Sequence, residues 1–305
     1  MIMKPQLKLL SLALLLSTPN LQLSTCFAQG SLTPPDAPAP TMKTLDQIEP
    51  RTPVDAVHTP GGAGIEYFIS QPGSYYLTGN IAGVDGEIGI IIQASDVTLD
   101  LNGFSLLGSP GAYFGVSIVG GYANVTVRNG TISGWNSEPG IYANGRHVVL
   151  EHLTITGNWQ GVNTAEDTVI RNCVVSDNAL DGIILGNNGV VSDCLVQSNA
   201  YNGISIQGAG SVIRGNNLCG NNSSGSFGTS GINIAGSNNR IEDNHVTGMG
   251  VGGYGIAVTG ATNNIIIRNS VEGGGANNYN IAASNDAGPI GNAATNTSPW
   301  GNISH

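Results

Sequence analysis

The residues best suited to acid–base chemistry in this sequence are four ionisable side chains close together, Arg240, Glu242, Asp243 and His245. Arg214 lies 28 residues before Glu242, and Arg268 lies 26 residues after it. A carboxyl group that keeps its proton can act as a general acid toward a glycosidic bond. A carboxylate between two guanidinium groups instead has a lowered pKa, which favours an ion pair. We therefore interpret Glu242 as a structural bridge between Arg214 and Arg268, with catalysis by this cluster as the alternative.

Three aromatic residues offer a different chemistry, the stacking of a sugar ring on an apolar face: Trp135, Trp159 and Tyr201. Indole and phenol rings present a flat apolar surface while their polar atoms stay in contact with water. Packing against a hydrophobic core is the more common role of large aromatic side chains. We interpret the three first as packing residues and name them as the candidates for carbohydrate binding.

The cysteines and histidines indicate no metal site, because the sequence has no Cys-x-x-Cys and no Cys/His cluster at zinc spacing. Cys173 and Cys194 are 21 residues apart, at equivalent positions of adjacent repeats. Their Cα atoms would lie about 5 Å apart, within reach of a disulfide. We predict two free, stacked thiols, with a disulfide as the alternative. No cofactor is predicted, and Ca²⁺ lacks support because the run 252–255 is not followed by the Asp of calcium-binding nonapeptides.

Two short patterns recur along the chain and must position these residues. One runs from β-branched residues into Gly or Asn, as in VRNGTISGW at Val127 and IRNCVVSDN at Ile170. The other begins Gly-Ile or Gly-Val, at intervals of 25, 21, 21, 21, 28 and 24 residues from Gly115 to Gly255. Short β-branched segments bounded by Gly, Asn or Asp are typical of strands. The sequence predicts an all-β fold, a single-stranded right-handed parallel β-helix of about eight rungs, where a rung is one turn of the coil.

Stacking the rungs in register predicts columns of equivalent residues about 4.8 Å apart. The inward column is apolar and comprises Ile155, Val175, Val196 and Leu218. A turn column of amides, which can hydrogen-bond along the coil and tolerate left-handed backbone, comprises Asn158, Asn178, Asn199 and Asn221. The charged column, with nearly alternating signs, comprises Arg128, Glu151, Arg171, Ser192, Arg214, Glu242 and Arg268. Each exposed ion pair in it would contribute about 0–1 kcal/mol.

Composition agrees with a coil of tight turns around a core. The 305 residues include 45 Gly and 33 Asn, and 40% of them are hydrophobic, which excludes a disordered chain. The formal net charge is −10, and without residues 1–28, which hold Lys4 and Lys8, it is 8 − 20 = −12. Nucleic acid and anionic membranes would repel so acidic a chain, so neither is a predicted partner.

The chain divides into four predicted segments: a signal peptide (1–28), a Pro-rich segment (29–64), the β-helix with an N-terminal hairpin cap (65–272) and a C-terminal cap (273–305). Basic residues precede an apolar run too short to span a bilayer, which predicts cleavage after Ala28 and no transmembrane segment. The protein is therefore expected to be secreted or periplasmic, with lipid attachment at Cys26 as the alternative. The hairpin is placed at 65–81, turning at Pro72-Gly73.

Four stretches carry a family resemblance: PGSYYLTGNI at Pro72, VTLDLNGFSLLG at Val97, NVTVRNGTISGW at Asn124 and SPWGNIS at Ser298. They resemble the secreted right-handed parallel β-helix repeat proteins of the pectin-lyase-like superfamily. The resemblance covers nearly all of the chain after the signal peptide and implies the fold. It does not specify an activity, because the superfamily includes lyases, hydrolases, epimerases, carbohydrate binders and phage tailspikes, and the subgroup that the chain resembles has no assigned activity.

The catalytic signatures that this resemblance would carry are missing. Ala165 follows Asn163-Thr164 where an Asp would be expected, and neither Asp-Asp nor Arg-x-Pro-x-x-Arg occurs. We therefore predict a non-catalytic extracellular or periplasmic module that binds polysaccharide. The alternative is a polysaccharide lyase, hydrolase or epimerase with an unfamiliar site. A neutral polysaccharide or cell-surface glycan is the expected partner of so acidic a chain, and the sequence indicates no oligomeric state.

Overall fold

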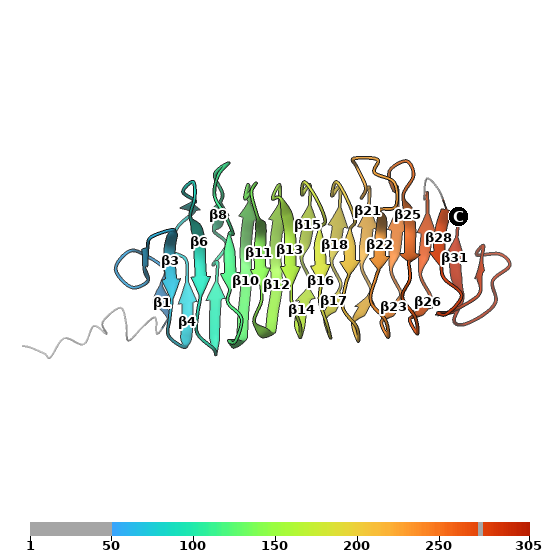
Figure 1. The fold of residues 1–305 in the computed structure, drawn as a ribbon, viewed down its shortest axis with the longest axis horizontal. Helices are drawn as coiled ribbons and strands as arrows, with labels where there is room; N and C mark the ends of the chain where they lie inside the picture. The colour runs from blue at the N-terminus through green and yellow to red at the C-terminus, as the bar shows by residue number, and fades with distance from the viewer. Residues whose placement is uncertain (1–50, 274–276) are drawn as a thin grey trace, which may run out of the picture. The chain divides into compact units, whose positions relative to one another are not determined.

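The chain folds into a coil of short parallel strands, described by a computed structural model over residues 51–273 and 277–305. Figure 1 shows the strands of successive rungs lying side by side. The described residues contain strands and no helix, which confirms the predicted fold class. The signal peptide, with its cleavage site after Ala28, and most of the Pro-rich segment lie outside the described residues.

One strand of each rung belongs to an 11-stranded sheet. In pairing order its strands are β2 (Pro60–Gly62), β3 (Ile65–Ile69), β6 (Ile88–Ile92), β9 (Val116–Ile118), β11 (Pro139–Ala143), β13 (Gln160–Thr164), β16 (Ile183–Leu185), β19 (Ile204–Ile206), β22 (Ser230–Ile234), β25 (Tyr254–Val258) and β28 (Asn277–Ile281). Except for the antiparallel β2–β3 pair, all neighbours pair in parallel. The strands from β3 to β28 mark ten rungs, more than predicted, because the sequence pattern weakens at both ends.

The remaining strands form a 20-stranded sheet that bends around the other sides of the coil. They are β1 (Thr52–Pro53), β4 (Gly73–Tyr76), β5 (Ile81–Ala82), β7 (Val97–Asp100), β8 (Ser105–Leu107), β10 (Ala123–Ser133), β12 (Arg146–Thr156), β14 (Thr168–Arg171), β15 (Val174–Ser176), β17 (Val190–Ser192), β18 (Leu195–Gln197), β20 (Val212–Arg214), β21 (Asn217–Cys219), β23 (Arg240–Glu242), β24 (His245–Thr247), β26 (Ile265–Ile267), β27 (Ser270–Glu272), β29 (Asp286–Ala287), β30 (Ile290–Gly291) and β31 (Asn302–Ser304). Most rungs therefore contribute two strands to this sheet and one to the other.

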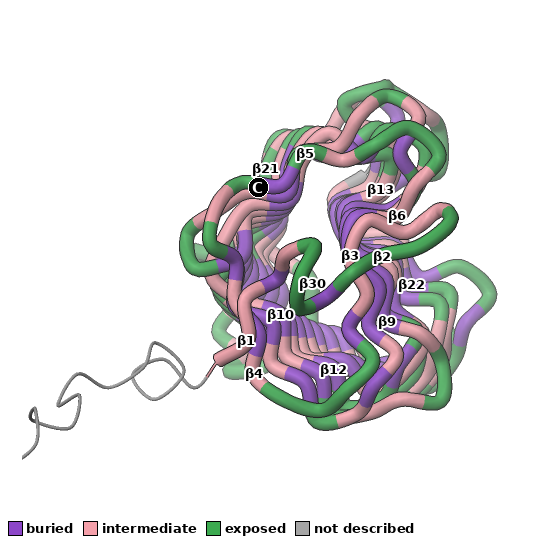
Figure 2. Tube along the Cα trace, turned by 90° about the vertical axis from the view of Figure 1, so that its left-hand side faces the viewer, coloured by how far each residue is buried: buried purple, intermediate pink, exposed green. Residues whose placement is uncertain are grey.

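The hydrophobic core is the inside of the coil, where buried residues line the tube in Figure 2. The predicted inward column is confirmed, because its four residues pair in register and are each 0% exposed: Ile155, Val175, Val196 and Leu218. Full burial of each such aliphatic side chain contributes about 1.5–3 kcal/mol. A rung alone buries little of this surface, so the stability of each rung depends on its neighbours.

The predicted amide column is confirmed as a hydrogen-bonded ladder, here called the Asn158 ladder. Asn158 Nδ2 donates to Asn178 Oδ1 (3.2 Å), Asn178 donates to Asn199 (2.8 Å), and Asn199 donates to Asn221 (2.9 Å). The left-handed backbone falls on the residues just before the four amides: Gly157, Asp177, Ser198 and Gly220, with φ between 54° and 63°. In each rung the left-handed residue turns the chain through the corner, so the side chain of the Asn that follows it points inward and is buried.

Two further amide ladders, which the repeat search missed, occupy the other corners. The Asn216 ladder comprises Asn216, Asn244, Asn269 and Asn302. The Asn239 ladder comprises Asn239, Asn264 and Asn285, and its first member accepts a bond from the Ser211 backbone N–H. Their members are spaced unevenly, 28, 25 and 33 residues apart in the first and 25 and 21 in the second, so no regular period indicates them in the sequence.

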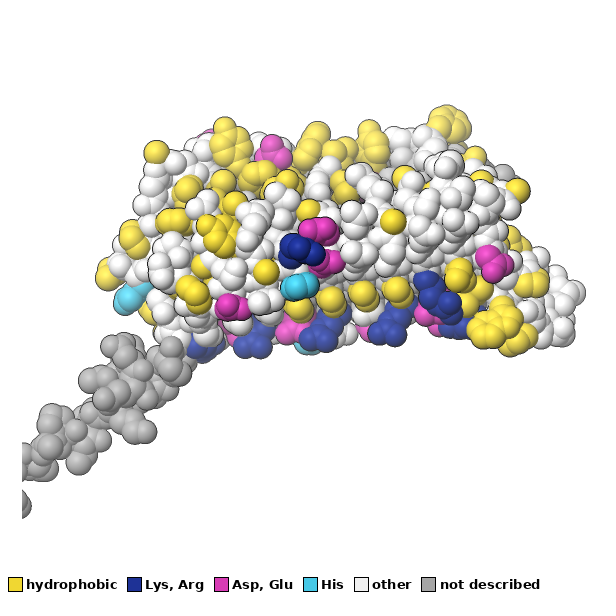
Figure 3. All heavy atoms as spheres, turned by 60° about the horizontal axis from the view of Figure 1, so that its bottom comes forward, with side chains coloured by type: hydrophobic (Ala, Val, Ile, Leu, Met, Phe, Trp, Pro, Cys, Tyr) yellow, Lys and Arg dark blue, Asp and Glu magenta, His cyan; other side chains and the backbone are white. Residues whose placement is uncertain are grey.

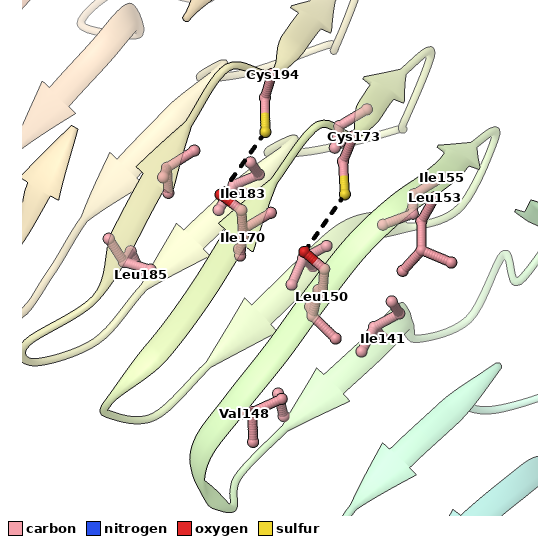
Figure 4. Packing of buried hydrophobic residues seen from close by; sticks show 14 of the residues in the cluster. Ile141, Val148, Leu150, Leu153, Ile155, Ile170, Cys173, Ile183, Leu185 and Cys194 are labelled. Atoms are coloured by element: carbon pink, nitrogen blue, oxygen red, sulfur yellow. Dashed lines mark hydrogen bonds between the residues drawn. The ribbon is translucent and has the colours of Figure 1, made fainter. Parts of the chain in front are cut away.

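Cys173 and Cys194 precede the Asn216 ladder at the same corner, since Asn216 Oδ1 accepts from the Cys194 backbone N–H (3.0 Å). Both thiols are free and buried, as predicted. Figure 4 shows them pointing toward the Leu150 and Ile170 carbonyls, with sulfur–oxygen distances of 3.6 and 3.8 Å. The neighbouring Cys173 thiol, together with burial, raises the pKa of Cys194. Cys194 is therefore a packing residue with little thiolate character.

The hairpin predicted at 65–81 is wrong. β3 and β4 belong to different sheets, and they pair in parallel with β6 and β7 of the next rung. Pro72-Gly73 therefore lies at the corner between β3 and β4. Each of these strands pairs in parallel with a strand of the next rung. The hairpin at this end joins β2 to β3 instead.

The coil also continues past residue 272, where the sequence period fades. β28 pairs in register with β25, and β29 pairs with β26. β31 then lies beside β27, and Asn302 Nδ2 donates to the carbonyls of Ile266 (2.9 Å) and Gly288 (3.0 Å). The C-terminal tail is therefore fastened to the last rungs by the end of an amide ladder.

Asn199→Ala is expected to lower the free energy of unfolding by about 2–4 kcal/mol, because it leaves two buried donors of Asn178 without an acceptor. Gln197→Ala, on the outer face of the same rung, is the matched control and should change stability by less than about 0.5 kcal/mol. Urea unfolding of both variants tests this. Equal losses would show that the ladder adds nothing beyond ordinary packing.

Thiol titration of denatured, unreduced protein that begins at residue 29 is expected to find three free thiols, because the thiols of Cys173, Cys194 and Cys219 are all free in the structure. Reduction before titration should leave that number unchanged. A single thiol before reduction, rising to three afterwards, would mean that Cys173 and Cys194 are joined.

Candidate functional site

The charged cluster predicted near the end of the coil is built around Glu242, the last residue of β23. Arg240, two residues earlier on the same face, donates to Glu242 Oε2 through Nε and Nη2, both at 2.8 Å. Arg268 Nη2 donates to the same oxygen at 2.8 Å and to Asp243 Oδ2 at 2.7 Å. Figure 3 shows a row of basic and acidic side chains along one side of the coil.

Both carboxylates of this cluster are held in the ionised form. The hydrogen bond from Arg240, with a further contribution from Arg268, lowers the pKa of Glu242. The hydrogen bond from Arg268 lowers the pKa of Asp243, and these contacts raise the pKa of Arg268 in return. A carboxylate fixed in this way is a poor proton donor at neutral pH. The geometry therefore favours a structural ion-pair network over acid catalysis.

The prediction that Glu242 forms an ion pair with Arg214 is wrong. Arg214 lies opposite Glu242 in the strand register, but its side chain is exposed and forms no ion pair or hydrogen bond with any described residue. Arg240 takes its place, because residues two apart on a strand project from the same face. Arg268 lies one residue beyond the column, since Ile267 is the residue that pairs with Glu242. A left-handed φ of 55° at Arg268 turns this part of the chain through the corner.

The rest of the charged column pairs in register as predicted, through Arg128, Glu151, Arg171, Ser192 and Arg214. Arg171 Nη2 lies 2.6 Å from Glu151 Oε2. Arg128 binds Asp100 at 3.2 Å, a buried carboxylate that heads the column. Asp100 pairs with Arg128 in the strand register but precedes the first clear repeat, so the repeat pattern does not predict it.

His245 does not join the cluster. It opens β24, on the far side of the Asn244 corner from Glu242. Its side chain is exposed and forms no hydrogen bond or ion pair within residues 51–273 and 277–305. The structure therefore places Arg240 and Arg268, and not His245, against Glu242.

Trp135 is not available to a sugar, which corrects its candidacy as a binding residue. Its side chain is 0% exposed, and its indole Nε1 donates to the Leu106 carbonyl at 3.4 Å. Gly83 and Gly89 make room for the ring, because a Cβ at either position would lie within 2.7 Å of it. The packing interpretation is therefore correct for Trp135.

Trp159 and Tyr201 are 41% and 38% exposed, and they belong to one column at the corner of the Asn158 ladder. Leu180 lies between them: its backbone N–H donates to the Trp159 carbonyl (2.8 Å), and its carbonyl accepts from Tyr201 (3.2 Å). The two rings are therefore two rungs apart, or about 10 Å along the coil. We call Trp159, Leu180 and Tyr201 the aromatic edge.

Residues 68–222 match the family model described as a right handed beta helix region. The chain belongs to this β-helix family. A search of curated protein sequences finds no match to the chain. Membership of the family agrees with the parallel register of the ten rungs and sets the right-handed sense of the coil.

Solved structures with the same fold include full-length tailspike protein 2 of an Escherichia coli O157:H7 bacteriophage (14% identity, TM-score 0.57) and its enzymatically active domain (15%, 0.54). Both alignments cover 83% of this chain, which spans only 38% and 41% of those tailspike chains. The A-module of a mannuronan C-5 epimerase of Azotobacter vinelandii aligns at 17% identity and TM-score 0.50, over 76% of this chain and 87% of that one. These similarities show a shared fold.

Two carboxyl groups that sequence analysis missed in this β-helix have raised pKa values. Burial raises the pKa of Asp181, beside Leu180, against a 2.6 Å hydrogen bond from Asn202. Burial and the nearby Glu87 carboxylate raise the pKa of Glu66 to about 7. Glu66 lies in β3 and Asp181 just before β16, five rungs away, so they do not form a catalytic pair. Burial in the fold is the largest cause of both raised pKa values, and no local sequence pattern indicates that burial.

The described part of this β-helix holds no group of three or more His, Cys, Asp or Glu side chains placed to bind a metal ion. Within the same residues, no helix is long and apolar enough to cross a membrane.

Glu242→Gln is expected to lower the free energy of unfolding at pH 7 by about 1 kcal/mol or less, because two partly exposed ion pairs lose their charge. The pKa of Glu242 is lowered in the folded state, so this contribution is present above its usual value of 4.5 and fades as the pH falls below it. The stabilities of wild type and variant should therefore converge as the pH falls through the lowered pKa of Glu242.

Arg214→Gln is the matched control, since Arg214 makes no ion pair with the described residues. Thermal unfolding at pH 7 and pH 3 should separate the two variants. If Arg214→Gln lowered the stability as much as Glu242→Gln does, the ion pairs assigned to Glu242 would be contradicted.

Proposed function

We propose that this chain is an exported, non-catalytic β-helix that binds a neutral polysaccharide along its aromatic edge. The observation that carries the proposal is the pair of part-exposed rings, Trp159 and Tyr201, held two rungs apart in one column. Rings whose backbones are held two rungs apart can stack against separate sugars of one polymer, which lowers the entropic cost of binding. Leu180 continues the apolar surface between them.

Polar groups lie directly beside the rings and can orient a sugar through its hydroxyls. Asn202 follows Tyr201 and donates to Asp181 Oδ1, and Asn163 Nδ2 donates to Gln160 Oε1 at 3.3 Å. A mixed surface of apolar faces and fixed hydrogen-bonding groups is typical of ligand sites that select by orientation.

Charge favours a neutral polymer over a polyanion. The formal net charge of the chain is −10, so a polyuronate would be repelled at low salt. One structure of the same fold is named as an epimerase of mannuronan, which supports polysaccharide as the ligand class; mannuronan is a polyuronate, so the choice of a neutral polymer rests on charge alone. The apolar run that precedes Ala28 supports export, where such polymers occur.

Enzymatic cleavage is the second candidate, and one observation favours it. The raised pKa of Asp181, next to the aromatic edge, would let that carboxyl donate a proton to a glycosidic oxygen. Hydrolysis would need a second carboxylate across the bond, and the pKa of Asp181 responds to no other carboxylate among the described residues. Binding without cleavage is therefore the better-supported function.

Affinity electrophoresis of residues 29–305 through gels containing hydroxyethylcellulose, galactomannan, alginate or polygalacturonate tests the proposal. We expect retardation by at least one neutral polymer, with little dependence on salt. Trp159→Ala and Tyr201→Ala should each weaken it about tenfold, the value of one stacked ring. Tyr113→Ala removes an exposed ring outside the edge and should have no effect.

Viscometry and reducing-end assays on the same polymers separate binding from cleavage. Chain scission that disappears in Asp181→Asn would establish an enzyme and overturn the non-catalytic proposal. Retention only by a polyuronate with Ca²⁺, unchanged by Trp159→Ala, would overturn both the ligand class and the site.

A further inference from the structure

A pocket of about 430 Å³ lies at the C-terminal end of the coil, away from the aromatic edge. Its floor is the outer face of β23 and β26, with Arg240, Ile265 and Ile267. Its wall is the tail, which contributes Asp286, Ala287, Gly288, Pro289 and Trp300. A pocket of this volume is in the range that holds a small organic ligand.

Hydrogen bonds fix the wall of this pocket. Asn296 Nδ2 donates to the Pro289 carbonyl (2.7 Å) and to the Asn302 carbonyl (2.9 Å), which ties the two arms of the tail together. Asn302, the last member of the Asn216 ladder, fastens the same arms to the final rungs through Ile266 and Gly288. The pocket is therefore formed before a ligand arrives, which lowers the entropic cost of binding.

Trp300 stands at the pocket with 54% of its surface exposed. The Arg268 guanidinium carbon lies 5.7 Å from the centre of its ring, and Arg268 is itself held by Glu242 and Asp243. A tail that served only to close the coil would gain more by burying this indole against the core. An exposed indole in a fixed position is suited to stacking on a ligand.

The polar groups in the pocket include a free acceptor and a spare donor. The Asp286 side chain is exposed and has no hydrogen bond or ion pair with any residue the structure describes. Arg240 uses Nε and Nη2 on Glu242, which leaves Nη1 unused by that bond. A carboxylate and a guanidinium nitrogen can bind neighbouring hydroxyl groups, one as acceptor and one as donor.

The charge of the pocket selects against acidic ligands. The two charged residues that line the pocket, Arg240 and Asp286, cancel each other, and the adjoining Glu242, Asp243 and Arg268 bring the local sum to −1. A phosphate or a uronate would find both arginines already engaged by carboxylates. A neutral ring with hydroxyls on its rim and an apolar face meets no such penalty.

We propose that this cap pocket binds one sugar unit of a neutral glycan, stacked on Trp300 and hydrogen-bonded to Asp286 and Arg240. The inference rests on the proposed function for its ligand class and adds a second, separate site. Two weak sites on one rigid coil would bind a long polymer more tightly than either alone, since the second contact becomes intramolecular.

NMR titration with the neutral disaccharides cellobiose, maltose and mannobiose tests the pocket independently of polymer binding. The chain has three tryptophans, so the indole N–H signals of Trp135, Trp159 and Trp300 can be assigned by substitution. We expect the Trp300 signal to shift saturably with at least one disaccharide, and the Trp135 signal, from the buried ring, to stay fixed.

Asp286→Asn should weaken that titration about tenfold by removing a charged acceptor. Trp300→Phe should retain most of the affinity for the disaccharide, and Trp300→Ala should lose it. Because these two variants lack the Trp300 indole signal, their binding is measured from the NMR signals of the disaccharide. Ile290→Ala, at an exposed cap residue that does not line the pocket, is the matched control. An unchanged Trp135 signal shows in every variant that the coil is intact.

The results separate the two proposals. Disaccharide binding lost in Trp300→Ala, with polymer retention lost in Trp159→Ala, supports both sites. Saturable shifts at Trp300 without any polymer retention support the cap pocket alone. A Trp300 signal that responds to no neutral disaccharide, or responds only to a digalacturonate, overturns the cap pocket whatever the aromatic edge binds.

Discussion

The structure depends on how buried backbone and side-chain polar groups are satisfied at the corners of each rung. A corner interrupts the regular pairing of strands, and an unsatisfied group there would cost about 1–3 kcal/mol. The three amide ladders solve this by letting each Asn accept from the rung before it and donate to the rung after it. Because every bond crosses from one rung to the next, the ladders also fix the register in which the rungs stack.

Both candidate sites derive their geometry from this register. The aromatic edge lies directly after the Asn158 ladder, so the separation of Trp159 and Tyr201 is set by the stacking of the rungs beneath them. The cap pocket depends on the last member of another ladder, Asn302, which holds the tail against β26. In each case a buried amide holds the backbone close to an exposed aromatic ring.

Side-chain columns that recur in successive rungs can be predicted from the sequence, whereas contacts that occur only once cannot. The inward column and the Asn158 ladder repeat in successive rungs, so their spacing alone places them correctly. The partner of Glu242 is Arg240, two residues away on the same strand, and a column that aligns one residue from each rung does not include this neighbour. Trp135 is buried because of room left by distant glycines. The cap pocket joins residues 240 and 300, which share no pattern.

Between stacked side chains the hydrogen bonds run in one direction, because wherever one ladder amide nitrogen donates to another amide, the acceptor lies closer to the C-terminus. At their first members the oxygens accept from backbone N–H groups, and at Asn285 and Asn302 the nitrogens donate to backbone carbonyls. The two ends of the coil are therefore chemically unlike. Both amide hydrogens of Asn285 and of Asn302 are used on carbonyls of this chain, so neither side chain leaves a donor for a further rung or for a second coil.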